Sequence, residues 1–172
     1  MLHSHYPLRI VGSKHAFTAL GLFIALAYPC QSTEIEAGAW AIKTGQSRGK
    51  PLEALLNKEL KSNDRNFPYR AILTISYLKP AADGLPQGEE RSMLKSIESQ
   101  LNDLITKNRT GKLAAIETHC SQSKFLFYVT NKMIARQAKE ALNIPPPYKI
   151  TMTVRKDSSW SYWRKIKSRF DY

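Results

Sequence analysis

From Tyr69 onward, a segment in which apolar residues alternate is followed by one in which they recur every three or four positions. This order limits the folds that the chain can adopt. Segment 69–78, "YRAILTISYL", alternates along its length, as a strand with one buried face does. Its apolar face holds Ala71, Leu73, Ile75 and Tyr77. Segment 89–108, "EERSMLKSIESQLNDLITKN", instead repeats apolar residues every three or four positions, which predicts an amphipathic helix. The stripe on this helix is Met93, Leu94, Ile97, Leu101, Leu104 and Ile105.

Four further elements continue the pattern. Segments 112–120 and 124–131 predict a β-hairpin around "SQS", and segment 148–156 predicts a last strand. Between them, segment 132–143 predicts a second helix, which "IPPP" ends. The apolar face of this helix is Met133, Ile134, Ala138 and Leu142. The β-α-β-β-α-β order predicts an α+β, ferredoxin-like sandwich with two helices on one face of an antiparallel sheet.

Two additions flank this unit. Segment 39–60 predicts an N-terminal β-hairpin around the turn 46–49, although its leucines also fit the start of a helix. Segment 158–170, "SSWSYWRKIKSRF", predicts a C-terminal helix capped by Asp157 or Ser158. Its aromatic residues share one side, so we expect core packing; a membrane or partner surface is the alternative. No linker interrupts residues 33–172, which we expect to form one domain.

The first residues have the pattern of an export signal. The apolar run 16–28, "AFTALGLFIALAY", follows a basic segment and ends near two cleavage sites, after Ala27 or after Ser32. We therefore expect residues 1–32 to be a signal peptide and the mature protein to be periplasmic or secreted. An uncleaved N-terminus that anchors the chain in the inner membrane is the alternative.

Charge is the strongest compositional signal. The chain has 26 Lys and Arg against 14 Asp and Glu, a formal net charge of +12. Such an excess favours anionic partners and allows peripheral contact with a membrane. Nucleic acid is not expected for an exported chain, and the glycines of the RNA-recognition signature are missing around Phe125 and Phe127.

Residues that usually carry chemistry are sparse. Beyond the signal, His119 is the only histidine, so neither a metal site nor a cofactor is expected. His119 and Cys120 are neighbours on a predicted strand and point to opposite faces, which argues against a catalytic Cys–His pair. Cys120 pairs with Cys30 only if cleavage spares Cys30; we expect no structural disulfide and a buried Cys120.

Acidic residues are the remaining candidates for catalysis. Glu89 and Glu90 are explained by stabilisation of a helix start, and Glu98 by a solvated helix face. We assign no catalytic residue and favour a non-enzymatic protein. The alternative is an enzyme that uses acidic residues of segment 83–98 in a pocket.

Several short motifs carry a family resemblance. Pro68 opens a strand, Asp83-Gly84-Leu85-Pro86 forms an acidic turn, and Ile97-Glu98 lies in the following helix. With "FLFYV" and the ending "DSSWSYW", these motifs resemble a bacterial family catalogued as domain-of-unknown-function family 695. The chain departs from the family at 120–123, "CSQS", where a Gly-rich turn is expected, which leaves the turn type open.

The resemblance implies a ferredoxin-like domain, distantly similar to the B-type regulator of ribonuclease E, a non-enzymatic inhibitor that binds a protein. An exported chain would not meet a cytosolic ribonuclease, so only the class carries over: a small binding or regulatory module. We expect it to bind another protein or an anionic envelope component; an immunity-type inhibitor of a toxin is an alternative. The candidate surface joins loop 79–90 to the outer face of helix 159–170. Its candidate binding residues are Asp83, Gly84, Glu89, Arg164, Lys165 and Lys167.

Overall fold

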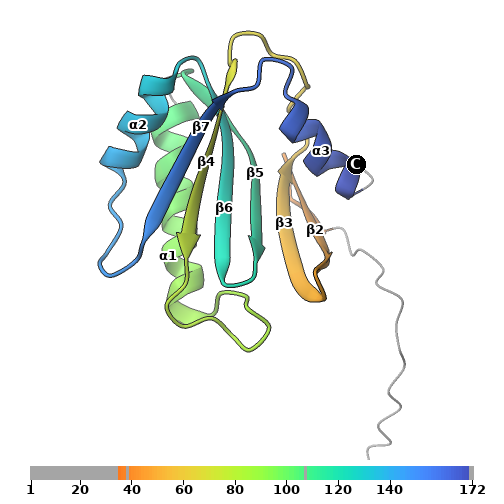
Figure 1. Cartoon of the computed structure of the whole chain (residues 1–172), viewed down its shortest axis with the longest axis vertical. Helices are drawn as coiled ribbons and strands as arrows, with labels where there is room; N and C mark the ends of the chain where they lie inside the picture. The colour runs from red at the N-terminus through yellow and green to blue at the C-terminus, as the bar shows by residue number, and fades with distance from the viewer. Residues whose placement is uncertain (1–34, 38, 107, 171–172) are drawn as a thin grey trace, which may run out of the picture.

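The computed structural model describes residues 35–170 apart from residues 38 and 107 (Figure 1). The predicted signal peptide, its cleavage sites and Cys30 lie outside the described residues. Within that range the fold is α+β, with seven strands in one antiparallel sheet in the order β1-β2-β3-β5-β6-β4-β7. The mixed α+β class predicted from the sequence is therefore confirmed.

The elements follow the predicted order, with one additional short strand at the start. The strands are β1 (Ile35–Ala37), β2 (Trp40–Ser47), β3 (Lys50–Asn57), β4 (Tyr69–Ser76), β5 (Gly111–His119), β6 (Gln122–Val129) and β7 (Ile150–Lys156). The helices are α1 (Gly88–Leu101), α2 (Lys132–Ala141) and α3 (Ser161–Arg169), with the π-helical turn η1 (Asn102–Thr106) after α1. β2 and β3 form the predicted N-terminal hairpin, so the ambiguous leucines of 52–56 belong to a strand.

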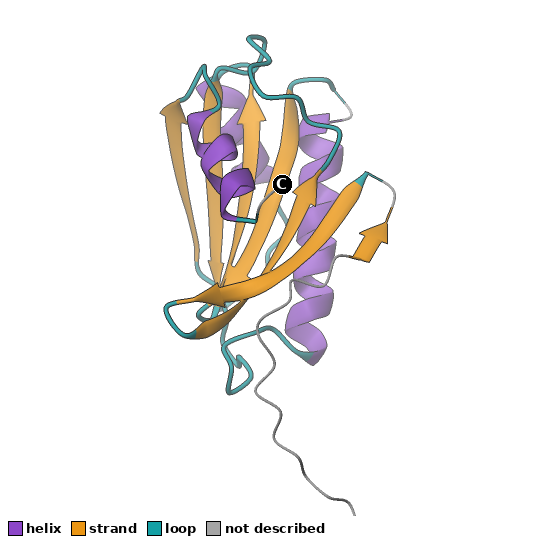
Figure 2. Ribbon diagram, turned by 90° about the vertical axis from the view of Figure 1, so that its right-hand side faces the viewer, coloured by secondary structure: helices purple, strands orange, loops and turns teal. Residues whose placement is uncertain are grey.

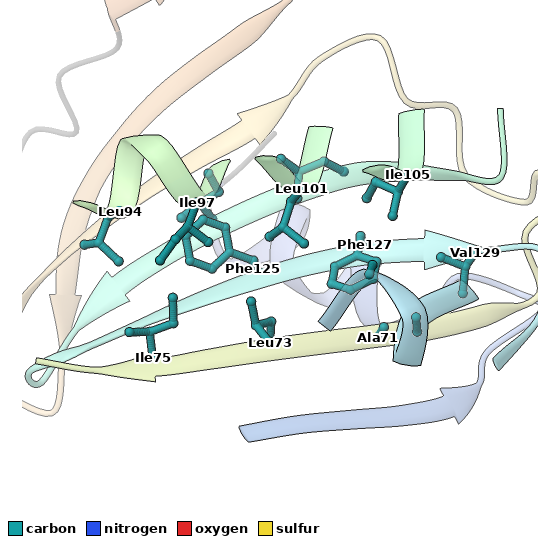
Figure 3. Packing of buried hydrophobic residues seen from close by; sticks show 14 of the residues in the cluster. Ala71, Leu73, Ile75, Leu94, Ile97, Leu101, Ile105, Phe125, Phe127 and Val129 are labelled. Atoms are coloured by element: carbon teal, nitrogen blue, oxygen red, sulfur yellow. The ribbon is translucent and has the colours of Figure 1, made fainter. Parts of the chain in front are cut away.

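Helices cover both faces of the sheet, and each face has its own core. α1 and α2 pack on one face, whereas α3 packs on the other (Figure 2). In the first core, α1 side chains meet Phe125 and Phe127 of β6 (Figure 3). In the second, Trp160, Trp163 and Ile166 meet β3, β5 and β6. The aromatic side of α3 is thus buried, as expected.

The two strongest sequence patterns are confirmed residue by residue. Ala71, Leu73 and Ile75 of β4 are fully buried, and Tyr77 nearly so. The stripe predicted for the first helix faces the core, with Leu94, Ile97, Leu101 and Ile105 buried and the other two partly buried. The helix itself is shorter than predicted. Its last turn widens into η1, which leaves Ile105 in the core.

The predicted face of the second helix is wrong at Met133, which is 57 % exposed. Ala135 and Ala138 are buried instead, with Ile134 and Leu142 beside them. Each residue turns a helix by about 100°. Met133 therefore points away from the face that the other residues share.

The β2–β3 and β5–β6 hairpin turns each have two residues in the left-handed region. Arg48 and Gly49 have φ of 55° and 74°, and Cys120 and Ser121 have φ of 50° and 61°. Positive φ at both central residues defines a type I′ turn, whose twist matches that of the strands. The turn left open by the sequence is therefore type I′. Cys120 lies in this turn, partly exposed, and is neither in the strand nor buried as expected.

Candidate functional site

A buried carboxylate lies at the start of α1. Glu90 is 4 % exposed, and its Oε1 accepts hydrogen bonds from the backbone N–H groups of Leu78 (2.6 Å) and Lys79 (2.8 Å). Its Oε2 has no hydrogen-bond partner in the part of the chain that the structure describes. Buried polar atoms are rarely left without a partner. In addition to its predicted place at a helix start, Glu90 thus ties the chain after β4 to the first turn of α1.

A surface pocket of about 380 Å³ surrounds this carboxylate. Three segments form its walls: the chain after β4, the first turn of α1 and the loop before β7. The lining residues are Leu78, Lys79, Gln87, Glu89, Glu90, Pro146, Pro147 and Tyr148. Leu78 is 47 % exposed and gives the pocket an apolar rim. The Pro146–Pro147 peptide bond is cis.

Tyr148 contributes a phenol side chain to the wall of the pocket. Partial burial, the negative charge of Glu90, the approach of the hydroxyl to the Glu90 carboxylate as a hydrogen-bond donor and, last, the charge of Glu89 raise the pKa of this hydroxyl above the ordinary value of 10.0. A phenol with a raised pKa stays protonated at neutral pH and can donate a hydrogen bond. The pocket thus combines two carboxylates, one cation (Lys79), a neutral donor and apolar walls, so that negative charge exceeds positive charge by one. Such a set suits a cationic group on an apolar stem.

The predicted residues Asp83 and Gly84 have structural roles in the same loop. Asp83 Oδ1 accepts a hydrogen bond from the backbone N–H of Leu85 (2.9 Å), which closes a local turn. Gly84 has φ of 81°, and its carbonyl accepts a hydrogen bond from the Ser121 N–H (2.9 Å). A Cβ at Gly84 would lie 3.2 Å from that nitrogen. The pair therefore fixes the loop against the β5–β6 turn, while the exposed Glu89 lines the pocket.

The predicted cations of α3 are not near this pocket. Loop 79–87 lies at the lower end of the molecule in Figure 1, whereas α3 lies towards the upper end, on the opposite face of the sheet. Arg164 donates to Asn63 Oδ1 (3.3 Å), and the Lys167 ammonium lies 5.9 Å from the centre of the Trp163 ring. Lys165 is exposed. The structure thus divides the single predicted surface into two.

A second acidic position also departs from the prediction. Glu98 is half-buried rather than solvated, and burial raises the pKa of its carboxyl, partly offset by the charge of Lys95. It lines a hollow of about 270 Å³ between α1 and the N-terminal hairpin, with Trp40 and Asn102. Within the described residues, this wall holds no buried side-chain atom that lacks a hydrogen-bond partner. Glu90 is therefore the more distinctive carboxylate.

Side chains that could bind a metal ion do not cluster in the described residues. Among them, no group of three or more His, Cys, Asp and Glu side chains could hold a metal ion. Burial, followed by the charge of Lys124, lowers the pKa of His119. None of the helices within residues 35–170 that the structure describes is both long and apolar enough to span a membrane.

Sequence reasoning missed the part of the pocket that precedes β7. The run "IPPP" was interpreted only as the end of a helix, yet Pro146, Pro147 and Tyr148 form one wall. Glu90 was named, but its burial depends on backbone amides twelve residues earlier. The available signal was the pair Glu89-Glu90, because the fold brings the first turn of α1 close to the proline-rich loop before β7.

Comparison with known proteins gives one match. The model of the Family of unknown function (DUF695) matches residues 39–166, most of the chain. The match extends from β2 into α3 and includes all the residues that line the pocket around Glu90. Neither the curated proteins nor the solved structures contain a match.

Proposed function

The chain belongs to DUF695, a family of unknown function, and we propose that it is a non-enzymatic binding module that holds a cationic group of a partner in the pocket around Glu90. The observation that carries the proposal is the Oε2 atom of Glu90, buried beside a pocket and without a hydrogen-bond partner among the described residues. A buried acceptor of this kind costs stability unless a donor completes it.

The composition of the pocket favours binding over catalysis. Oε1 of Glu90 already accepts two backbone hydrogen bonds, and the Tyr148 hydroxyl is held in its neutral form. No histidine, cysteine or serine lines the pocket in the described part of the chain. A lysine or arginine side chain of a partner protein fits the set, because its aliphatic stem can pack on Leu78 and Pro147 while its head reaches Oε2.

We also assign the ferredoxin-like plan to the fold. The order β5-β6-β4-β7, with every pair antiparallel, supports this assignment. In chain order these four strands run β4, β5, β6 and β7; α1 follows the first of them and α2 the third, and both helices share one face. The β1–β2–β3 strands and α3 are additions to this plan.

The setting of the proposed activity is the cell envelope. The signal-like N-terminus supports export, and the partner would then be a periplasmic or surface protein rather than RNA or a cytosolic ribonuclease. Intact mass spectrometry of periplasmic, membrane and cytosolic fractions tests this. A soluble periplasmic form lacking residues 1–27 or 1–32 is expected, whereas an uncleaved chain in the cytosol would contradict export.

Titration of the mature protein followed by ¹⁵N NMR tests the pocket. We expect n-butylammonium and n-propylguanidinium to shift the amide signals of Leu78, Lys79 and Tyr148, and the matched anion butyrate to leave them unchanged. Glu90→Gln keeps an oxygen for the two backbone amides but replaces the free acceptor, so it should weaken binding about tenfold or more.

Two variants complete this test. Glu98→Gln makes the same chemical change outside the pocket and should leave binding unaltered. Lys79→Ala removes the cation that the chain itself places in the pocket wall and should strengthen binding. Equal binding by the wild type and Glu90→Gln would overturn the proposal.

The buried Glu90 also keeps the enzymatic alternative testable, because that alternative requires a buried carboxylate in a cleft within segment 83–98. Turnover of a broad hydrolase substrate panel, lost in Glu90→Gln, would replace binding with catalysis as the function. An immunity-type inhibitor is a special case of the binding proposal in which the partner is a toxin. A toxin gene beside this one would favour that case.

A further inference from the structure

The strand at one edge of the sheet is open. β7 ends the strand order, and in the described residues no backbone hydrogen bond reaches its outer side. It is seven residues long and contains no proline or bulge. An edge strand with these properties can accept another strand.

The pairing register identifies the free amides. Ser76 N–H donates to the Lys149 carbonyl (3.4 Å), and Asp157 N–H donates to the Pro68 carbonyl (2.8 Å). Antiparallel pairs alternate between hydrogen-bonded and non-hydrogen-bonded residues. Counting from either bond, the backbone groups of Met152 and Val154 point away from β4, and those of Thr153 point towards it.

Three basic side chains lie beside the free backbone groups of Met152 and Val154. Lys132, Arg136 and Lys139 occupy one side of α2 at helical spacing, and with Met152 and Val154 they line a hollow of about 330 Å³. None of the three makes an ion pair in the described part of the chain. Lys132 lies 5.8 Å from the centre of the Tyr69 ring. The one carboxylate on α2, Glu140, is not among the lining residues.

We propose that β7 and the cationic side of α2 form a docking surface for an extended acidic segment of a partner protein. The segment adds to the sheet as an eighth strand, bonded to the free backbone groups of Met152 and Val154. Every second side chain of such a strand faces α2. Acidic residues at those positions meet Lys132, Arg136 and Lys139, and the hollow provides the room.

A second copy of this chain is a poor occupant of the same edge. Pairing of two β7 edges would bring the cations of both α2 helices together, along with Arg155 and Lys156 at the end of each strand. Like charges at that spacing repel. The charges that discourage self-pairing are therefore the ones that favour an acidic strand. The inference does not depend on the pocket around Glu90, which involves other residues.

The test uses the mature protein and a short acetylated peptide in which glutamate alternates with threonine; a lysine–threonine peptide is the control. We expect only the acidic peptide to bind. Upon binding, the amides of Met152 and Val154 should become protected from hydrogen exchange. Those of Thr151 and Thr153, already bonded to β4, should not change.

Charge reversal separates this site from the overall positive charge. Arg136→Glu should weaken binding roughly tenfold or more, whereas Lys165→Glu, the same charge change on the other face of the sheet, should alter it less than about twofold at physiological salt. Binding without protection of Met152 and Val154, an equal effect of the two reversals, or dimerisation through β7 in the absence of peptide would each overturn the proposal.

Discussion

At the scale of single residues, one hydroxyl joins the second core to the start of α3. Tyr128 donates to Asp157 Oδ2 (2.8 Å) and accepts a hydrogen bond from the Trp163 N–H (3.2 Å). Its ring stacks on Trp160 with 3.9 Å between ring centres. Burial, together with the hydrogen bond to Asp157 and its charge, raises the pKa of Tyr128 well above the ordinary range, so it remains a donor.

Removing the Tyr128 hydroxyl should lower the stability of the fold. Tyr128→Phe leaves the buried Trp163 N–H without an acceptor and removes one of the two hydrogen bonds to Asp157 Oδ2. This should lower the free energy of unfolding by about 1–3 kcal/mol. Urea unfolding of the mature protein measures it. Tyr162→Phe is the matched control, since no hydrogen bond of its hydroxyl is found in the described chain; it should change stability by less than about 0.5 kcal/mol.

Asp157 gives a prediction for acid stability. Burial alone would raise the pKa of Asp157, but hydrogen bonds from Tyr128, Ser161 and the backbone N–H of Tyr162 outweigh burial and lower the pKa below 3.8. A pKa lower in the folded than in the unfolded state stabilises the fold above the unfolded value, about 3.9, and this contribution is lost as pH falls through the folded value.

Asp157→Asn should therefore be less stable than the wild type by about 1–2 kcal/mol at neutral pH. The difference should remain constant down to about pH 5 and shrink below about pH 4. Urea unfolding at a series of pH values measures it. A difference that does not depend on pH would contradict the assigned hydrogen bonds to the charged carboxylate.

At the scale of elements, the patterns that depend on one segment were predictable, and those that depend on two were not. Alternation in β4 identified its buried face, because Ala71, Leu73 and Ile75 contact one layer of helices. The face of α2 was misjudged because small residues, Ala135 and Ala138, are buried there and the large Met133 is not. Side-chain size in the sequence says little about how closely a helix approaches its sheet.

The burial of Glu90 could not be predicted for the same reason, because it depends on two segments. Tertiary contacts with Leu78 and Lys79 bury Glu90, and nothing in the local sequence distinguishes it from its exposed neighbour Glu89. At the start of α3 the predicted cap, Asp157 or Ser158, is wrong: Trp160 occupies the cap position and its side chain makes no capping hydrogen bond. Asp157 lies three residues before the cap position, yet it accepts hydrogen bonds from the N–H groups of Ser161 and Tyr162 in the first turn of the helix.

The β2–β3 and β5–β6 turns allow opposite substitutions that test their backbone conformation. Ser121 has φ of 61°, a conformation that glycine adopts without strain, so Ser121→Gly should stabilise the protein by about 0.5–1 kcal/mol. Gly49 has φ of 74°, and no atom lies within 4 Å of the position that a Cβ would occupy, so Gly49→Ala should destabilise by about 1 kcal/mol through strain alone. Urea unfolding measures both, and effects of the same sign would contradict the type I′ turns.

At the scale of the whole molecule, the excess of positive charge is unevenly distributed. The chain carries a formal net charge of +12, yet the pocket around Glu90 is acidic, with two carboxylates in its wall. The open edge beside α2 is cationic. A partner that binds both would present an extended acidic segment and a separate lysine or arginine side chain. Overall charge alone indicated only anionic partners, because composition does not show where charges lie.

The most direct test of the account is a crystal structure of the mature protein grown with n-propylguanidinium. The account predicts a guanidinium nitrogen at hydrogen-bond distance, about 2.7–2.9 Å, from Glu90 Oε2, with the propyl chain against Leu78 and Pro147. A structure in which Oε2 is bonded to the Tyr148 hydroxyl and the pocket holds no guanidinium would contradict it.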